Sequence, residues 1–170
     1  MITSKNTSIN SKKVPAIFKK IEWINHGETI NVDIGGGKYD TAVEYLKQFG
    51  IKNIIFDPYN RSMGENIKTI CDVVMYGAES ATISNVLNVI PQRGKRIDLL
   101  KKAKRWANVV FISVYEGDKS GVGRKTKKDC WQENRKLKEY FDEVGEVFEE
   151  YTIHNGMIVA WDSNKIETNL

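Results

Sequence analysis

Three consecutive glycines follow a short apolar segment in the first quarter of the sequence. Residues 30–34 lead directly into Gly35, Gly36 and Gly37. This pattern is typical of a buried parallel strand that turns sharply into a helix, because glycine accepts positive φ and lets a ligand approach the backbone. Asp57 stands twenty residues after Gly37, at the end of another apolar run, where an acidic side chain can reach the hydroxyls of a ribose. The spacing predicts a pocket for a nucleoside-containing cofactor.

The glycine motif departs from the dinucleotide-binding pattern at its third position. Asp40 stands where Gly-x-Gly-x-x-Gly has its last glycine, so a carboxylate lies near the helix N-terminus where a pyrophosphate would bind. A cofactor without phosphates is therefore favoured, and S-adenosylmethionine is one. Its ribose would contact Asp57, and its positively charged sulfonium and amino groups would face carboxylates such as Asp33. A glycine turn without any ligand is the alternative. A nicotinamide-dependent oxidoreductase is less favoured, because Asp40 stands where the pyrophosphate of its cofactor would bind.

The composition is that of a soluble globular domain. The chain has 170 residues, of which 41% are apolar and 28% charged, enough to bury about two thirds of the unfolded surface. We expect residues 1–10 to form a disordered tail and residues 11–170 a single domain. The polar N-terminus has no signal-peptide pattern and no apolar run reaches the length of a membrane span, which predicts a cytoplasmic protein without a membrane anchor. Two cysteines and two histidines are too few for the usual zinc sites, so we expect no metal.

The positive charge is concentrated in one part of the chain. The net charge is +4, but residues 92–138 contain 15 basic and 5 acidic side chains. This region is either a solvated helix face or a site for a polyanion such as DNA or RNA. Within it, residues 116–129 contain three glycines and no apolar periodicity, which predicts a loop that could close as a lid over a substrate. The expected substrate-binding residues are Lys119, Arg124, Lys125, Lys127 and Lys128.

Apolar periodicity and turn residues indicate alternating helices and strands. Helices are predicted over 11–25, 39–49, 64–70, 95–107 and 132–144, the third ending before residues 72–76. Strands are predicted over 30–34, 53–56, 81–87, 108–115, 147–153 and 157–161, and Asn155-Gly156 indicates a hairpin between the last two. These elements predict an α/β fold: a doubly wound, Rossmann-like, mostly parallel sheet with helices on both faces and an antiparallel C-terminal hairpin strand. Ligands bind such sheets at the carboxyl ends of the strands.

Residues 12–161 resemble the class I S-adenosylmethionine-dependent methyltransferase family. Residues 33–37 stand at the position of its glycine-rich cofactor loop, Asp57 at its ribose-binding acid, and residues 84–91 at the fourth-strand segment that passes beneath the adenine and methionine portions. Glu79 stands near the place of an acid that contacts the adenine amino group. The cofactor-binding residues implied by the resemblance are Asp33, Gly35, Gly36, Gly37, Asp57, Pro58, Tyr59, Glu79, Ser84, Asn85 and Val86. Residues 12–15, 84–90 and 115–121 are also similar to small methyltransferase-domain proteins of phages and mobile elements.

The resemblance implies methyl transfer to an acceptor that the sequence does not identify. The reaction mainly needs donor and acceptor to be aligned, and orientation alone can supply about 7–11 kcal/mol of the barrier. Tyr115 and Glu116 are the candidates for orienting the acceptor, and the catalytic base is left open. Both the Asn/Asp-Pro-Pro-Tyr/Phe segment of amino-directed nucleic-acid methyltransferases and a Pro-Cys nucleophile are missing from the sequence. Two alternatives stay open: a non-catalytic module that binds S-adenosylmethionine or nucleic acid, and an enzyme that cleaves S-adenosylmethionine.

Overall fold

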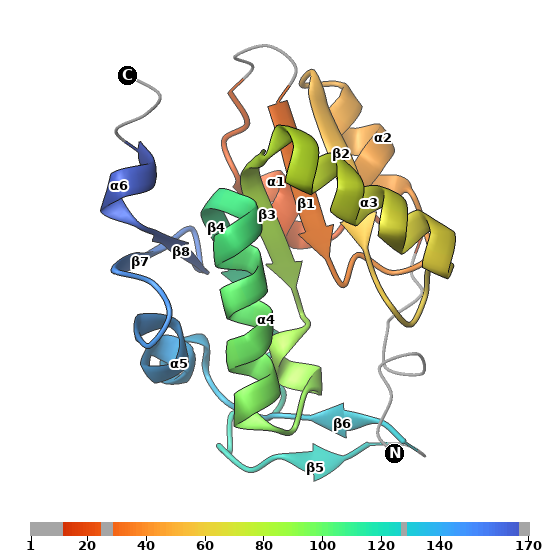
Figure 1. Cartoon of the computed structure of the whole chain (residues 1–170). Helices are drawn as coiled ribbons and strands as arrows, with labels where there is room; N and C mark the ends of the chain where they lie inside the picture. The colour runs from red at the N-terminus through yellow and green to blue at the C-terminus, as the bar shows by residue number, and fades with distance from the viewer. Residues whose placement is uncertain (1–11, 25–28, 127–128, 167–170) are drawn as a thin grey trace.

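A single six-stranded sheet organises the chain in the computed structural model, which describes residues 12–24, 29–126 and 129–166 (Figure 1). The strand order is β2-β1-β3-β4-β8-β7. The first four of these are parallel, while β8 runs antiparallel to β4 and β7 antiparallel to β8. The strands are β1 (Thr29–Ile34), β2 (Ile51–Phe56), β3 (Ala78–Ser84), β4 (Ala107–Ser113), β7 (Glu150–His154) and β8 (Met157–Trp161).

Helices cover both faces of this sheet. On one face α1 (Ala16–Lys20) and α2 (Thr41–Lys47) share an apolar cluster with Ile51 and Met157. On the other, α3 (Met63–Tyr76), α4 (Arg93–Trp106) and α5 (Phe141–Gly145) enclose the larger cluster, which includes residues of β1, β3, β4 and β8. The predicted fold, a doubly wound, Rossmann-like, mostly parallel sheet with an antiparallel C-terminal hairpin, is confirmed. Among the described residues, each helix is too short or too polar to cross a bilayer.

Helix α3 is longer than the sequence pattern predicted. It begins with a reciprocal capping box between Ser62 and Glu65 and ends at Gly77, which has a φ of +70°. The prediction ended the helix before residues 72–76, and this was wrong. Val74, Met75 and Tyr76 are exposed in its last turns, so the apolar pattern there does not follow the buried face and gives no helical signal.

The chain leaves the sheet earlier than expected after β3. A strand was predicted over residues 81–87, but β3 ends at Ser84 and Asn85 has a φ of +56°. The amide of Asn85 donates a hydrogen bond to the Ser113 carbonyl at 2.8 Å. The short helix η2 (Leu87–Val89) follows, so the apolar side chains beyond Asn85 belong to a turn and not to a strand.

Two predicted helices are shorter than expected, and one loop has more structure. Of the predicted 11–25 helix, the described residues 12–24 contain only α1, and Ile24 is exposed. Strand β6 (Trp131–Gln132) occupies the start of the predicted 132–144 helix and pairs with β5 (Arg124–Lys125). Helical structure begins only at η3 (Leu137–Tyr140), which runs into α5, and an unpredicted helix, α6 (Ser163–Ile166), follows β8.

The loop predicted as a glycine lid is held in place by a buried asparagine. The Asn134 side chain donates a hydrogen bond to the Val122 carbonyl at 2.8 Å, and its backbone carbonyl accepts one from Gly121 at 2.8 Å. A Cβ on Gly117 would overlap the Asn134 side chain. Gly117 is therefore required for close packing, and residues 117–122 are held against Asn134 by these contacts.

Candidate functional site

A cavity of about 270 Å³ lies at the carboxyl ends of β1, β2 and β3. Four segments form its walls: the end of β1 with the glycine turn, residues 56–59 after β2, residues 86–92 after β3, and one side of α4. Its position agrees with the rule that doubly wound sheets bind ligands at the carboxyl edge. Of the expected cofactor-binding residues, those that line the cavity are Gly35, Asp57, Pro58, Tyr59 and Val86.

The glycine turn brings β1 close to the segments after β2 and β3. Gly35 has a φ of +80° and its amide donates a hydrogen bond to the Phe56 carbonyl at 2.7 Å. A Cβ at Gly35 would overlap the Val86 side chain. Gly37 has a φ of +75°. Glycine at positions 35 and 37 is thus explained by the backbone conformation, and at position 35 also by packing against the cavity wall.

Asp33 and Gly36 lie beneath this turn and outside the cavity lining. A Cβ on Gly36 would overlap the Asp33 carboxylate and lie 3.0 Å from Cγ2 of Ile55. Gly36 is therefore needed because of the buried acid below it. Asp33 is only 1% exposed, so the expected contact between Asp33 and a ligand's cationic groups is not available in this conformation.

Burial sets the protonation of Asp33. Loss of solvent raises the pKa of this carboxyl to about 7, against an opposing hydrogen bond that Thr82 Oγ1 donates to Asp33 Oδ1 at 3.1 Å. The Asp57 carboxylate raises the pKa further and Arg61 lowers it. Asp33 consequently titrates near neutral pH.

The Asp57 carboxylate organises the turns on both sides of the cavity. Oδ2 accepts hydrogen bonds from the Gly37 amide at 2.9 Å and from Asn60 Nδ2 at 3.0 Å. Oδ1 accepts from the amides of Tyr59 at 2.9 Å and Asn60 at 3.0 Å. An ionised carboxylate offers about four lone-pair sites, and all four are used. A ribose hydroxyl would have to replace one donor, and Asn60 Nδ2 is the one on a side chain that can rotate away.

Arg61 neutralises the Asp40 carboxylate beside the glycine turn. Its Nε donates a hydrogen bond to the Gly37 carbonyl at 2.7 Å, and its Nη2 lies 2.8 Å from Asp40 Oδ1. Asp40 therefore repels a phosphate less than the sequence alone suggests, because its carboxylate is already paired.

Three further expected cofactor residues do not line the cavity. Glu79 lies near the amino end of β3, with Oε2 3.4 Å from Nδ2 of Asn108, whereas the cavity lies at the carboxyl end. Its expected contact with an adenine amino group is not supported by this register, because Ser84 lies five positions further along the extended strand, a distance of about 16 Å. Ser84 and Asn85 end the strand without reaching the cavity wall.

One side of α4 forms a wall that sequence reasoning missed. Lys95, Asp98, Leu99 and Lys102 line the cavity at helical spacing. Lys102 Nζ lies 4.4 Å from the centroid of the Phe56 ring, and burial, then Arg105, lowers the pKa of Lys102. The spacing of these four residues is a visible signal, but only the structure shows which side of the helix faces the cavity.

A buried arginine on α4 positions the cavity wall formed by residues 90 and 91. Arg96 of α4 forms a bidentate ion pair with Glu143, with Nε–Oε2 and Nη2–Oε1 distances of 2.8 and 2.7 Å. Its Nη1 donates hydrogen bonds to the carbonyls of Ile90 at 2.7 Å and Pro91 at 3.2 Å. Because residues 90 and 91 line the cavity, the ion pair determines where this wall lies.

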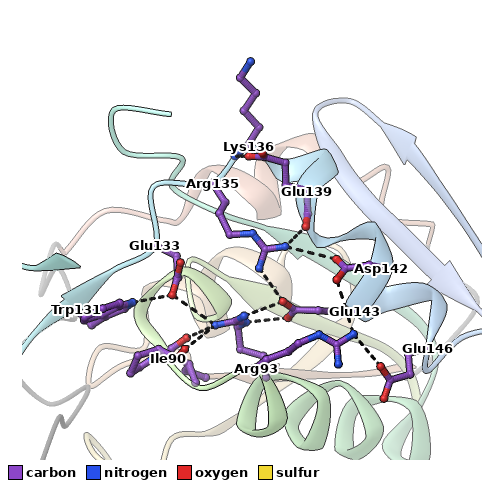
Figure 2. Close-up of polar contacts among 12 residues, drawn as sticks. Ile90, Arg93, Trp131, Glu133, Arg135, Lys136, Glu139, Asp142, Glu143 and Glu146 are labelled. Atoms are coloured by element: carbon purple, nitrogen blue, oxygen red, sulfur yellow. Dashed lines mark hydrogen bonds and ion pairs between the residues drawn. The ribbon is translucent and has the colours of Figure 1, made fainter. Parts of the chain in front are cut away.

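The same cluster ties the β5–β6 ribbon to α5. Arg135 Nη1 donates to Glu143 Oε1 at 2.7 Å, and Glu133 Oε1 accepts from Trp131 Nε1 at 2.9 Å while lying 3.6 Å from Arg96 Nη1 (Figure 2). Burial alone would raise the pKa of Glu143, but hydrogen bonds from the two arginines outweigh it and lower that pKa. The cluster is therefore charged and internally neutralised.

The candidate acceptor-orienting residues lie in a different cavity. Tyr115, Glu116 and Lys119 line a second hollow after β4 that shares no lining residue with the first. Glu116 Oε1 accepts a hydrogen bond from the Leu137 amide at 2.7 Å, and this bond, with the Lys119 ammonium, lowers the pKa of Glu116. Glu116 is consequently a weak base whose two carboxylate oxygens are already engaged by Leu137 and Lys119, so it is poorly suited to act as a general base.

The expected basic substrate-binding residues are partly paired. Lys119 Nζ lies 3.3 Å from Glu116 Oε2, and Arg124 forms an ion pair with Asp118. Lys125 is exposed on β5. Lys127 and Lys128 lie outside the described residues. In the part of the chain that the structure describes, no group of three or more His, Cys, Asp or Glu side chains could hold a metal ion.

Comparison with known proteins gives only distant structural likenesses. No family model and no curated protein matches the sequence. Among solved structures, the chain is similar to the crystal structure of the N-terminal domain of EvdMO1 with SAH bound, at 14% sequence identity and a TM-score of 0.49. The likeness covers 80% of this chain and 75% of that one.

Proposed function

We propose that the chain is an S-adenosylmethionine-dependent methyltransferase that binds the cofactor in the cavity between the glycine turn and α4. The observation that carries the proposal is the junction of Gly35, the 57–59 turn and the 86–92 segment around one cavity. A volume of about 270 Å³ is close to the lower end for ligand sites. The nucleoside portion would lie between Phe56, Val86 and Leu99, with its ribose toward Asp57.

The residues present fit this cofactor in part. Gly35 lines the cavity without a side chain, so its backbone is open to the ligand. Asp57 would accept ribose hydroxyls only after Asn60 Nδ2 moves from its carboxylate. Asp98 is the exposed carboxylate of the α4 wall, and we propose that it faces the cationic portion of the cofactor in place of Asp33. When bound, S-adenosylmethionine would supply an activated methyl group, and the chain would hold donor and acceptor in line.

We propose nucleic acid as the acceptor class, because unpaired cations gather near the carboxyl edge. Lys125, Lys136 and Lys138 are exposed and form no ion pair with another described residue. The phosphate backbone dominates the binding of nucleic acid through such side chains. Lys127 and Lys128, which lie outside the described residues, extend the same basic segment in the sequence.

A non-catalytic binding module is the second candidate function. Glu116, one of the two candidates for orienting the acceptor, has both carboxylate oxygens engaged by Leu137 and Lys119. This observation favours a protein that binds ligand without turning it over. Methyl transfer to nucleic acid would exclude the module, and formation of cleavage products without any acceptor would indicate an enzyme that cleaves S-adenosylmethionine instead.

Calorimetric titration tests the cofactor assignment. Wild-type protein should bind S-adenosylhomocysteine and S-adenosylmethionine, and should bind NAD at least tenfold more weakly. Gln92 lines the cavity, is exposed, and makes no side-chain cap for α4, so Gln92→Trp should fill the cavity without removing a core contact. We expect this variant to lose at least tenfold in affinity for S-adenosylhomocysteine.

The matched control places the same side chain on a different surface. Val74→Trp adds a tryptophan to the exposed side of α3 and should bind S-adenosylhomocysteine like the wild type. The cavity assignment is wrong if both variants bind S-adenosylhomocysteine equally well. Tighter binding of NAD than of S-adenosylhomocysteine by the wild type would instead indicate a dinucleotide-binding protein.

A further inference from the structure

A second cavity, of about 570 Å³, lies beyond the carboxyl end of β4. Residues 114–117 follow β4 directly, and Gly156 precedes β8, which runs antiparallel to β4 with Ile158 opposite Ile112. The start of η3, at residues 136–138, closes the third side. Sheet register thus brings three segments that are distant in sequence around one hollow.

The lining of this cavity is positively charged. Lys119, Lys136 and Lys138 line it, and Glu116 is the acid among its lining residues. Glu116 is already engaged, since Oε1 accepts from the Leu137 amide at 2.7 Å and Oε2 lies 3.3 Å from Lys119 Nζ. Lys136 and Lys138 form no ion pair with another described residue. In Figure 2 the Lys136 side chain points away from the arginine–glutamate cluster, so its charge is available to a ligand.

A fourth cation comes from the opposite end of the sequence. Lys20 Nζ lies 3.5 Å from the position that a Cβ on Gly156 would take. The end of α1 is held there because Asn155 Nδ2 donates a hydrogen bond to the Lys20 carbonyl at 3.2 Å. The contact between α1 and the hairpin turn therefore places the Lys20 charge beside Gly156, which lines the cavity.

An exposed aromatic ring stands among these cations. The Tyr115 residue is 61% exposed, although its carbonyl is fixed by a hydrogen bond from Gln132 Nε2 at 2.9 Å. Ile153, which is 47% exposed, lines the same hollow. A fixed backbone with an exposed ring gives a flat apolar surface on which an unpaired base can stack.

We propose that this cavity binds single-stranded nucleic acid, with one base stacked on Tyr115 and the flanking phosphates held by Lys136 and Lys138. The proposal rests on nucleic acid as the acceptor class of the proposed function and assigns its form and place. A positively charged groove combined with an aromatic platform is the usual way to hold a single strand. Paired bases in a duplex do not present a free face to Tyr115, so duplex should bind more weakly.

Fluorescence anisotropy with a labelled 12-nucleotide oligodeoxythymidine tests the proposal. The wild type should bind this strand at least fivefold tighter than a duplex of equal length, and oligouridine serves as the RNA arm. Tyr115→Ala should weaken binding about tenfold through loss of base stacking. Tyr115→Phe keeps the ring and should bind like the wild type.

Charge-matched variants separate the cavity from general electrostatics. K136Q/K138Q should reduce the slope of log K against log salt by about 1.4, which corresponds to two phosphate contacts on a single strand. K47Q/K101Q removes two exposed cations on α2 and α4 and should leave that slope unchanged. Equal loss in the two double variants, duplex binding as tight as single-strand binding, or equal binding by Tyr115→Ala and Tyr115→Phe would overturn the proposal.

Titration with S-adenosylhomocysteine keeps this result distinct from the cofactor assignment. The variants at residues 115, 136 and 138 should bind it with unchanged affinity, because none of them lines the first cavity. Cofactor binding without binding of the oligonucleotide would defeat the single-strand proposal alone. Oligonucleotide binding without cofactor binding would support the single-strand site and leave the methyltransferase proposal defeated.

Discussion

At the scale of single residues, the acid beneath the glycine turn has an unusual environment. Asp33 belongs to a buried polar row across β1, β2 and β3, in which Asn31 Nδ2 donates to Asn53 Oδ1 at 2.7 Å and to Thr82 Oγ1 at 3.1 Å. Ser80 Oγ donates to Asn31 Oδ1 at 2.8 Å. This row places polar groups in a sheet interior that would otherwise be apolar. Burial in that interior raises the pKa of Asp33, and the hydrogen bond from Thr82 of the row opposes the rise.

Asp33→Asn should remove a pH dependence of stability. The folded-state pKa of about 7 exceeds the ordinary value of 3.8, so the native state binds more protons than the unfolded state between these values, and stability is lost as pH rises through 7. Relative to wild type, the variant should gain about 2.5 kcal/mol in unfolding free energy between pH 5 and pH 8. Urea denaturation at the two pH values measures this.

A carboxylate with the opposite shift provides the control. Hydrogen bonding from Lys68 lowers the pKa of Asp72 below its ordinary value of 3.8. Asp72 is therefore ionised in both the folded and the unfolded protein between pH 5 and pH 8, and Asp72→Asn should differ from wild type by the same amount at both pH values. A difference between wild type and Asp33→Asn that is the same at pH 5 and pH 8 would show that Asp33 is not protonated in the folded protein.

At the scale of elements, a buried ion pair between Arg96 and Glu143 joins α4 to α5 and positions the 90–91 wall of the first cavity. Arg96 and Glu143 side chains are 5% and 1% exposed. Removing one member of a buried pair leaves the other charge without compensation. The neighbouring pair of Arg93 and Glu146, at 2.8 Å, joins the same two elements at the surface (Figure 2), which offers a direct comparison.

Glu143→Gln should destabilise the protein by about 3–5 kcal/mol, because Arg96 and Arg135 both lose their shared carboxylate. Glu146→Gln removes an exposed partner and should cost at most about 1 kcal/mol. Guanidinium denaturation of the two variants measures the difference. Similar unfolding free energies in both would mean that the buried pair does not hold α4 against α5.

At the scale of the whole molecule, ion pairs within the protein neutralise part of the charge of the basic region, residues 92–138. Four of its cations lie in ion pairs with acids that follow residue 138, namely Arg93, Arg96, Lys104 and Arg135. The excess positive charge counted along residues 92–138 is therefore partly structural. What stays available lies on exposed turns of α4 and at the carboxyl edge beside β5 and η3.

R124Q/K125Q/K127Q/K128Q should weaken single-strand binding and make it less salt-dependent. Each phosphate contact contributes about 0.7 to the slope of log K against log salt, and Arg124 is already paired with Asp118, so we expect a reduction of about 2. K19Q/K47Q/K101Q/R105Q changes the net charge equally at exposed positions elsewhere. Anisotropy titrations at several salt concentrations compare them, and equal slopes in the two variants would refute a local site.

The sequence by itself determined the approximate positions of the six sheet strands along the chain and the places where the chain turns. Gly35 and Gly37 have the positive φ expected of the turn after β1. Asn155 and Gly156 have φ values of +50° and +71° in the hairpin between β7 and β8. These features were predictable because each depends on the conformational range of a few adjacent residues.

Only the tertiary structure decided which side chains of these motifs face a cavity. Asp33 and Gly36 turn beneath the glycine loop, the Asp57 carboxylate is taken up by the turns it organises, and Arg96 meets Glu143 across 47 positions of sequence. A short pattern specifies the direction of the backbone, since its causes are local. The partner that a polar side chain finds depends on how distant segments pack, because a buried polar group must be satisfied by whatever packing brings close to it.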